Sequence, residues 1–190
     1  GAGPSPIRGH SNVQGDRTMG INEKASKPFL DAVGAEFGFT PRYQPGLDAV
    51  GTVQRLRAHQ VRVFFGLGGN FAMATPDTPV VLDGLRHCDL TVQVSTKLNR
   101  SHTVTGRSAL ILPVRGRTDR DITSSGTQFV TVEDSQGQVR KSTGRLDPPS
   151  AQLIGEPTLV ARLAGAVLGD SDPVPWHTYT HDYAAVRDAI

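Results

Sequence analysis

The sequence has a single cysteine, Cys88, and no long apolar run. One thiol cannot form an intrachain disulfide, which excludes a disulfide-stabilised scaffold and favours a reducing compartment, the cytoplasm. No stretch approaches the roughly 18 consecutive apolar residues that a membrane-spanning helix needs. The opening residues GAGPSPIRGH also lack the apolar centre of a signal peptide. We therefore expect a cytoplasmic protein without a membrane segment.

An excess of charge of one sign is also lacking. The 20 basic and 18 acidic residues are spread along the chain and leave a net charge of only +2. This mixture does not form the basic patch that nucleic-acid binding requires, so no nucleic-acid partner is expected. With 190 residues and 37% hydrophobic content, the chain can bury the core of one globular domain, or of one and a half.

Motifs of common hydrolases are missing as well. The chain has no G-x-S-x-G elbow, no S-x-x-K and no Walker A sequence. His177 and His181 have the spacing of metal ligands on a helix, but HTYTH is poor in helix formers and has no third ligand nearby. Cys88 lies in the apolar segment LDGLRHCDL, which is typical of a small buried residue. We therefore assign no metal ligand and no catalytic residue to this chain.

The spacing of apolar residues predicts several helices. Pro28 falls in the first turn of a helix that Gly38 ends, and a second helix runs from about residue 47 to 56. Thr78 is placed to cap a third helix and Pro79 to open it. The segments PTLVARLAGAVLG, which Gly169 ends, and DYAAVRDAI predict the last two.

Three apolar runs predict strands at residues 61–65, 90–95 and 108–114, and the first is typical of a strand buried on both faces. Strand, helix and strand in this order form parallel sheets, whose ligands bind outside the carboxyl ends of the strands. The segment TQFVTVEDSQGQVRKST predicts a hairpin with its turn at residues 135–137.

We expect an α/β fold: a three-layer, Rossmann-like, mostly parallel sheet with helices on both faces. The α/β domain is expected over residues 28–170. A loop arm at residues 1–27 precedes it, and a linker with a short helix follows at residues 171–190.

The glycine-rich segment GLGGN follows the first predicted strand. Gly66 and Gly68 match the first two glycines of a dinucleotide fingerprint, but Phe71 stands at the third, and the next strand does not end in a ribose-binding acid. Ordinary NAD binding is therefore disfavoured. Glycines in this place still let a ligand approach the backbone closely, and Asn70 could bond a phosphate or a base.

The segment STKLNRSH follows the next strand. Its hydroxyl, amide and cationic donors suit a polyphosphate or nucleotide at the same edge of the sheet. The structural alternatives are a plain tight turn for the first segment and a solvated loop for the second. The candidate donors of the second segment are Ser95, Thr96, Lys97, Asn99, Arg100, Ser101 and His102.

Six segments in order resemble the molybdopterin oxidoreductases, and especially their formate-dehydrogenase-like branch. NVQGDRTMG is similar to an N-V-Q-G loop, FFGLGGNF to a strand followed by G-E-N-P, and LTVQVSTKLNRSH to V-V-Q-D with a Thr-rich turn. ALILP, GTQFVTVEDSQGQV and the helix ending AGAVLG are similar to the segments that follow in that family. Gly69, Phe71 and Val94 depart from the usual Glu, Pro and Asp of these motifs.

The resemblance implies a fragment of a larger oxidoreductase that holds a bis-molybdopterin guanine dinucleotide cofactor with molybdenum. It places Gly66, Gly68, Gly69 and Asn70 near one guanosine diphosphate arm, and the residues of STKLNRSH near its guanosine. Asn12, Gln14 and Gly15 would approach the pterin end. The 4Fe-4S cluster and the molybdenum ligand would lie upstream of this chain.

The implied partners are the remaining domains of the parent chain, a small-molecule substrate and an electron-transfer partner, and the fragment alone is expected to be inactive. Two alternatives remain open at this point. One is a free-standing nucleotide-binding or regulatory module, and the other is a purely structural interaction domain.

Overall fold

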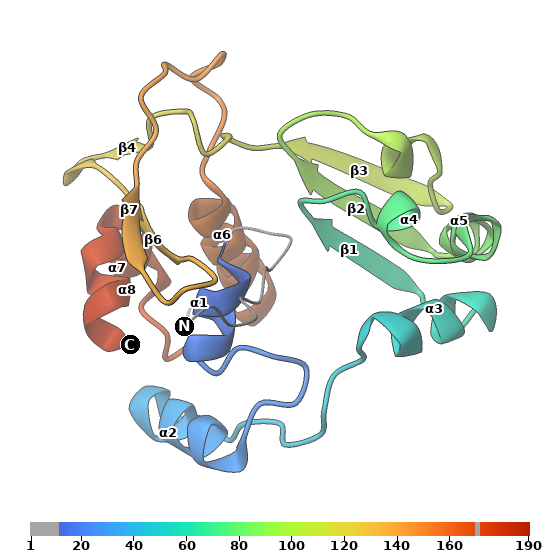
Figure 1. The fold of residues 1–190 in the computed structure, drawn as a ribbon, viewed down its shortest axis with the longest axis horizontal. Helices are drawn as coiled ribbons and strands as arrows, with labels where there is room; N and C mark the ends of the chain where they lie inside the picture. Colours follow the sequence, from blue (N-terminus) through green and yellow to red (C-terminus); the bar gives the residue numbers. More distant parts are fainter. Residues whose placement is uncertain (1–11, 170–171) are drawn as a thin grey trace, which may run out of the picture. The chain divides into compact units, whose positions relative to one another are not determined.

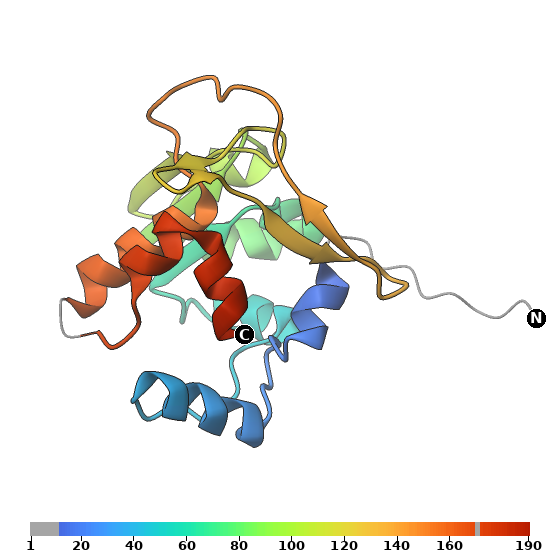
Figure 2. The same cartoon turned by 90° about the vertical axis from the view of Figure 1, so that its left-hand side faces the viewer.

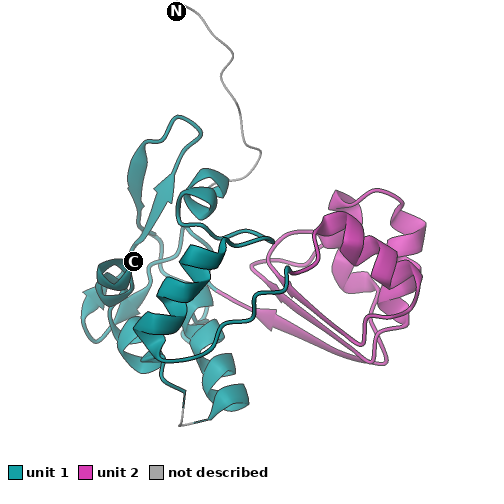
Figure 3. Ribbon diagram, turned by 90° about the horizontal axis from the view of Figure 1, so that it is seen from below, with its two compact units in different colours: residues 1–45, 115–190 teal, residues 46–114 magenta. Residues whose placement is uncertain are grey.

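The computed structural model describes residues 12–169 and 172–190, whose elements run from α1 to α8 (Figure 1). Two compact units make up the chain (Figure 3). We call residues 46–114 the sheet unit, and residues 1–45 with 115–190 the hairpin unit. The opening segment GAGPSPIRGH and the start of the expected DSDPVP linker lie outside the described residues.

The sheet unit contains three parallel strands in the order β1-β2-β3 (Figure 1). They are β1 (Val63–Leu67), β2 (Leu90–Ser95) and β3 (Ser108–Pro113). Helix α5 (Thr78–Arg86) connects β1 to β2, and α3 (Ala49–Arg57), α4 (Phe71–Ala74) and the 3-10 helix η1 (Arg100–Thr103) complete the unit. The predictions of an α/β class and of a parallel sheet are confirmed.

The core of the sheet unit lies on one face of the sheet. Phe64 on β1 packs there with Leu56 of α3, Ala72 of α4 and Leu85 of α5. Cys88 belongs to the same cluster and is fully buried, as its apolar surroundings predict. Burial raises the pKa of its thiol, and the charge of Asp89 raises it further.

The prediction that the first strand is buried on both faces is wrong. Strand β1 begins at Val63 rather than Val61, and it pairs only with β2, so it is an edge strand. The helices that pack with Phe64 cover one face, whereas Val63, Phe65 and Leu67 alternate with it and are 58%, 40% and 47% exposed. A period-2 alternation places these three side chains on the opposite face.

Helix starts in the sheet unit follow local chemistry. The Asp48 side chain accepts a hydrogen bond from the Gly51 N–H at 2.7 Å and caps α3. The prediction that Thr78 caps α5 is wrong: Thr78 is the first helical residue, and the cap is Asp77, which has a positive φ of 58° and no side-chain capping bond. Pro79 lies in the first turn, as expected.

The hairpin unit contains the helices α1 (Val13–Thr18), α2 (Lys27–Phe37), α6 (Glu156–Leu168), α7 (Trp176–His181) and α8 (Tyr183–Ala189). Strands β4 (Ile122–Thr123) and β5 (Gly126–Thr127) form one antiparallel pair, and β6 (Val130–Glu133) and β7 (Val139–Ser142) form the predicted hairpin (Figure 2). Ser26 caps α2, and Gly38 ends it at a φ of 69°. Both helix ends agree with the prediction.

Two helices form where irregular structure was expected. α1 replaces the predicted N-V-Q-G loop, and the Asn12 side chain anchors its start by accepting a hydrogen bond from the Glu133 N–H of β6 at 2.9 Å. α7 contains the segment HTYTH. It contacts α6 and α8, and Trp176 Nε1 donates to Asp172 Oδ2 at 2.5 Å. Tertiary contacts therefore override the weak helix propensity of this segment.

Among the helices described for residues 12–169 and 172–190, none is both long and apolar enough to cross a membrane.

Candidate functional site

The two polar segments predicted from the sequence meet at the carboxyl edge of the parallel sheet. The Gly68 N–H donates to the Val94 carbonyl at 2.8 Å and holds the glycine loop against the end of β2. Gly68 and Gly69 have φ values of +71° and +72°, and beyond the adjacent residues no described residue has an atom within 4 Å of the position of a Cβ at either one. The backbone of this turn is therefore open to close approach by a ligand.

Asn99 and Ser101 join the second segment to the first. Asn99 Nδ2 donates to the Gly69 carbonyl at 2.7 Å, and Ser101 Oγ donates to Asn70 Oδ1 at 2.7 Å. Ser101 Oγ in turn accepts from the Ala72 N–H at 3.0 Å and is fully buried. These bonds fix the direction of the Asn70 amide, so the two loops form a single ordered edge.

Two buried side chains of this unit have donors without a partner among the described residues. The Asn99 N–H donates to His102 Nδ1 at 2.9 Å, which leaves Nε2 as the N–H donor of that ring. His102 Nε2 is buried and has no hydrogen-bond partner within the described part of the chain, and the same holds for Gln93 Nε2 on β2. Buried donors are normally satisfied, so each of these is suited to an acceptor from a bound group.

The charge at this edge is positive. Between Ser95 and Val104 the sequence has Lys97 and Arg100 but no acidic residue, and both side chains are exposed. Ser95 Oγ donates to the Lys97 carbonyl at 2.8 Å and shapes the turn, whereas Thr96 is exposed. Exposed cations beside an open backbone turn can bind a phosphate group.

The remaining predicted site residues lie elsewhere. Gly66 belongs to β1, where a Cβ would lie 2.7 Å from Gln93 Oε1, so this glycine allows close packing. Asn12, Gln14 and Gly15 belong to the hairpin unit, in or beside α1. A Cβ at Gly15 would lie 2.0 Å from Asn12 Oδ1, so that glycine permits the Asn12 side chain to reach β6.

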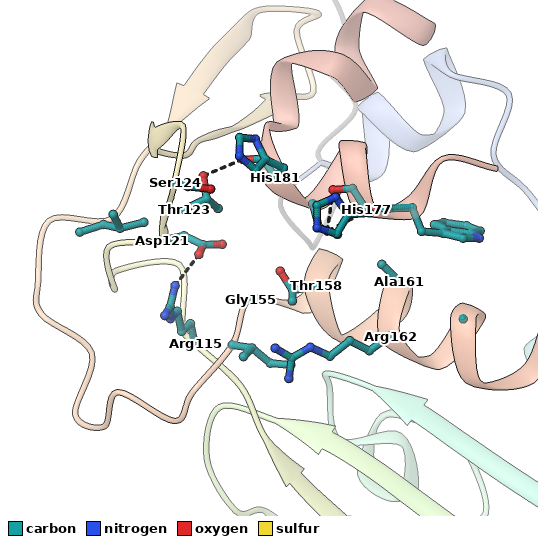
Figure 4. A pocket seen from close by; sticks show the side chains of 15 residues that line it. Arg115, Asp121, Thr123, Ser124, Gly155, Thr158, Ala161, Arg162, His177 and His181 are labelled. Atoms are coloured by element: carbon teal, nitrogen blue, oxygen red, sulfur yellow. Dashed lines mark hydrogen bonds and ion pairs between the residues drawn. The ribbon is translucent and has the colours of Figure 1, made fainter. Parts of the chain in front are cut away.

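Sequence reasoning missed a pocket of about 570 Å³ in the hairpin unit (Figure 4). Asp121 pairs with Arg115 and accepts a hydrogen bond from the buried Tyr183 hydroxyl at 2.6 Å. Thr158 and Arg162 of α6 lie on another wall, and His177 and His181 of α7 on a third (Figure 4). In the sequence, the spacing of His177 and His181 suggests only a pair of metal ligands, not the wall of a pocket.

The pocket has an excess of donors. Arg115 Nε is buried and has no hydrogen-bond partner among the described residues, and Arg162 is exposed toward solvent. Burial, together with the adjacent Asp121, raises the pKa of Tyr183, which remains a neutral donor to that carboxylate. The arrangement suits a small anion. In the sequence, the signal that points to this pocket is Arg115, which directly follows the third predicted strand.

The sheet unit is thus a parallel α/β unit whose ligand-accessible loops lie at the carboxyl edge, the usual place for a ligand in such sheets. The chain is 55% identical over all of its 190 residues to an uncharacterized oxidoreductase of Mycobacterium bovis. It is 46% identical over the same length to the protein YdeP of Escherichia coli K12. It spans only 24% and 25% of the lengths of these two relatives.

A putative formate dehydrogenase of Bacillus subtilis, YrhE, is 26% identical over 140 residues, which are 67% of this chain and 14% of that protein. No family model matches the chain. The chain is therefore similar, over its whole length, to one segment of larger proteins, the first of which is named an oxidoreductase.

Proposed function

We propose that this chain is the part of a molybdenum-dependent oxidoreductase that holds one arm of a bis-molybdopterin guanine dinucleotide. The observation that carries the proposal is the hydrogen-bonded junction of the Gly68–Asn70 turn with Asn99 and Ser101. Similarity to an oxidoreductase supports the redox class, and the order of the six motifs supports this cofactor.

The residues of this edge fit a guanosine diphosphate group. The open positive-φ glycines give a diphosphate access to the backbone, and Lys97 and Arg100 offer counter-charges. Asn70, fixed by Ser101, offers a hydrogen bond to ribose or base oxygens, and so do the donors of His102 and Gln93 that have no partner among the described residues. Because Val94 stands where the family has an Asp, guanine recognition is assigned to the neighbouring Ser95, Thr96 and Lys97.

When bound, the cofactor would supply the redox chemistry at molybdenum. The residues of this chain bind and orient it. The loops of the sheet unit hold the nucleotide end, and Asn12, Gln14 and Gly15 are assigned to the pterin end. A formate-like substrate is the finer part of the proposal, and its support is the similarity to YrhE.

Substitution of Gly69 by Ala in the full-length protein that contains this chain tests the proposal. The matched control is Gly38→Ala, because Gly38 has a φ of +69° and equally open surroundings at the end of α2. Both variants carry the same backbone strain, but only Gly69→Ala places a methyl group on the cofactor edge. We expect about tenfold weaker cofactor retention in Gly69→Ala, a loss of about 1.4 kcal/mol, and unchanged retention in Gly38→Ala.

Molybdenum is measured by mass spectrometry, and guanine nucleotide is measured after acid release. If the full-length protein, purified anaerobically, contained neither molybdenum nor guanine nucleotide, the proposal would be ruled out.

Titration of the isolated chain with GTP, GDP and NAD separates the other classes of protein: micromolar binding by the chain alone identifies a free-standing nucleotide-binding module. Formate-dependent dye reduction by the full-length protein tests the substrate.

A further inference from the structure

Three side chains with metal-ligating atoms converge on the helical side of the sheet unit, outside the loops described above. His59 directly follows the last turn of α3, Asp83 is on α5, and His87 ends α5. His59 Nε2 lies 2.9 Å from Asp83 Oδ2, and His87 Nδ1 lies 3.7 Å from the same oxygen. One ligand atom from each residue lies within 4.8 Å of the other two.

The two imidazole rings are stacked face to face. Their centroids are 3.6 Å apart, and their planes differ by 11°, so a ring must turn before both lone pairs can reach one ion. His87 Nδ1 lies 2.9 Å from the Asp83 carbonyl oxygen, and because a carbonyl only accepts, Nδ1 carries the ring proton. In this tautomer the lone pair of His87 is on Nε2, so His87 would bind an ion through Nε2, or through Nδ1 once the bond to the carbonyl is given up. A backbone hydrogen bond of this kind is the usual way in which a metal-ligating histidine is oriented.

The backbone on both sides of the cluster is well packed. His59 has a φ of 54°, and its N–H bonds to the Leu56 carbonyl at 2.9 Å. Leu56 is fully buried, and Gly84, next to Asp83, packs directly against its backbone. Asp83 and His87 are thus presented from α5 and its end, and His59 from the turn that directly follows α3, where the two helices pack against each other.

We propose that His59, Asp83 and His87 form a binding site for a divalent transition-metal ion, for which Zn²⁺ is the probe. Two imidazoles and one carboxylate suit zinc, and the side-chain exposures of 43%, 53% and 48% leave room for water to complete a tetrahedral shell. The ion would replace the hydrogen bond between His59 and Asp83 and would join the end of α3 to α5. This site does not depend on the proposed cofactor.

The test is calorimetric titration of metal-stripped chain with ZnCl2, together with thermal unfolding with and without the ion. We expect one Zn²⁺ per chain and a higher Tm in its presence. Asp83→Asn and His87→Gln each remove one ligand and should weaken binding by more than about tenfold. His59→Asn does the same and suits the left-handed backbone, because asparagine tolerates a positive φ.

The double variant His177→Gln and His181→Gln is the control. These exposed histidines are four residues apart, as Asp83 and His87 are, but their ring centroids lie 6.3 Å apart, and within the described part of the chain no carboxylate joins them in a metal-binding cluster. The control should bind Zn²⁺ as the wild-type chain does. Unchanged binding in folded Asp83→Asn and His87→Gln, or loss of binding in the control, would overturn the proposal, and so would absence of binding by the wild-type chain.

Discussion

At the scale of single residues, Tyr183 makes two hydrogen bonds within the hairpin unit, one through its hydroxyl and one through its backbone N–H. Its hydroxyl donates to Asp121, the carboxylate that also pairs with Arg115, and its backbone N–H donates to Gln128 Oε1 at 2.9 Å. Tyr183 and Gln128 are only 5% and 6% exposed. A buried bond to a charged acceptor contributes more than a neutral one, because the carboxylate has little water to replace the lost donor.

Tyr183→Phe should therefore lower the free energy of unfolding by about 2 kcal/mol. The pH dependence has a definite sign. The pKa of Tyr183 is raised in the folded chain, so the stability it contributes is fully present below the unfolded value near 10 and is lost as the pH rises above it. Urea unfolding between pH 7 and 11 measures both effects, and the difference between wild type and Tyr183→Phe should shrink above pH 10.

Tyr43→Phe is the matched control. The Tyr43 hydroxyl also donates to a carboxylate, Asp31 Oδ1, at 2.7 Å, but the residue is 49% exposed. Its removal should cost less than that of Tyr183, since water can replace the lost donor. Equal losses in the two variants would show that burial of Tyr183 adds nothing to its bond.

At the scale of elements, α3 and α5 pack closely because Gly84 of α5 has no side chain. A Cβ at Gly84 of α5 would lie 2.6 Å from Leu56 Cβ and 2.8 Å from the Leu56 backbone. Two helices can approach this closely only where one of them has glycine, although glycine weakens a helix by itself. The packing of the sheet unit therefore takes precedence over helix propensity at this position.

Gly84→Ala should destabilise the chain by about 2 kcal/mol, because backbone atoms of Leu56 cannot move aside as a flexible side chain would. Gly165→Ala, in the interior of α6, is the comparison: apart from the backbone of α6 itself, no described residue has an atom within 4 Å of its Cβ position, so the change should stabilise by about 0.5 to 1 kcal/mol. Thermal and urea unfolding measure the change in stability of both variants. A stabilising Gly84→Ala would contradict the packing argument.

The elements with strong local signals were the predictable ones. The helix after Pro28, the helix ended by Gly169 and the hairpin at residues 135–137 each carry a cap, a period or a turn residue. The meeting of GLGGN with STKLNRSH followed from the parallel-strand rule alone. α1 depends on contacts with β6, which lies far away in the sequence, and α7 depends on packing against the neighbouring helices α6 and α8. The cluster of His59 and Asp83, 24 residues apart, depends equally on tertiary packing.

At the scale of the whole molecule, the two outer strands of the sheet expose apolar side chains, whereas the central strand β2 is buried. All-parallel sheets normally have both faces covered, but the helices of the sheet unit pack on the face of Phe64. The register sets Phe65 opposite Val92 and Val92 opposite Leu110 on the other face. Phe65 and Leu110 are 40% and 50% exposed there, whereas Val92 between them is only 6% exposed. Exposed apolar side chains along the outer strands of a sheet mark either an interaction surface or a tendency to aggregate.

The isolated 190-residue chain should therefore bind the dye ANS and self-associate at high concentration. The double variant Phe65→Lys and Leu110→Glu should reduce ANS fluorescence by about half or more without lowering Tm, because it removes exposed rather than buried apolar surface. Val50→Lys with Val167→Glu makes the same charge changes at residues that are 64% and 71% exposed on separate helices. If both double variants reduced ANS binding equally, the dye would be reporting scattered exposed residues, and the outer strands of the sheet would not form a dye-binding surface of their own.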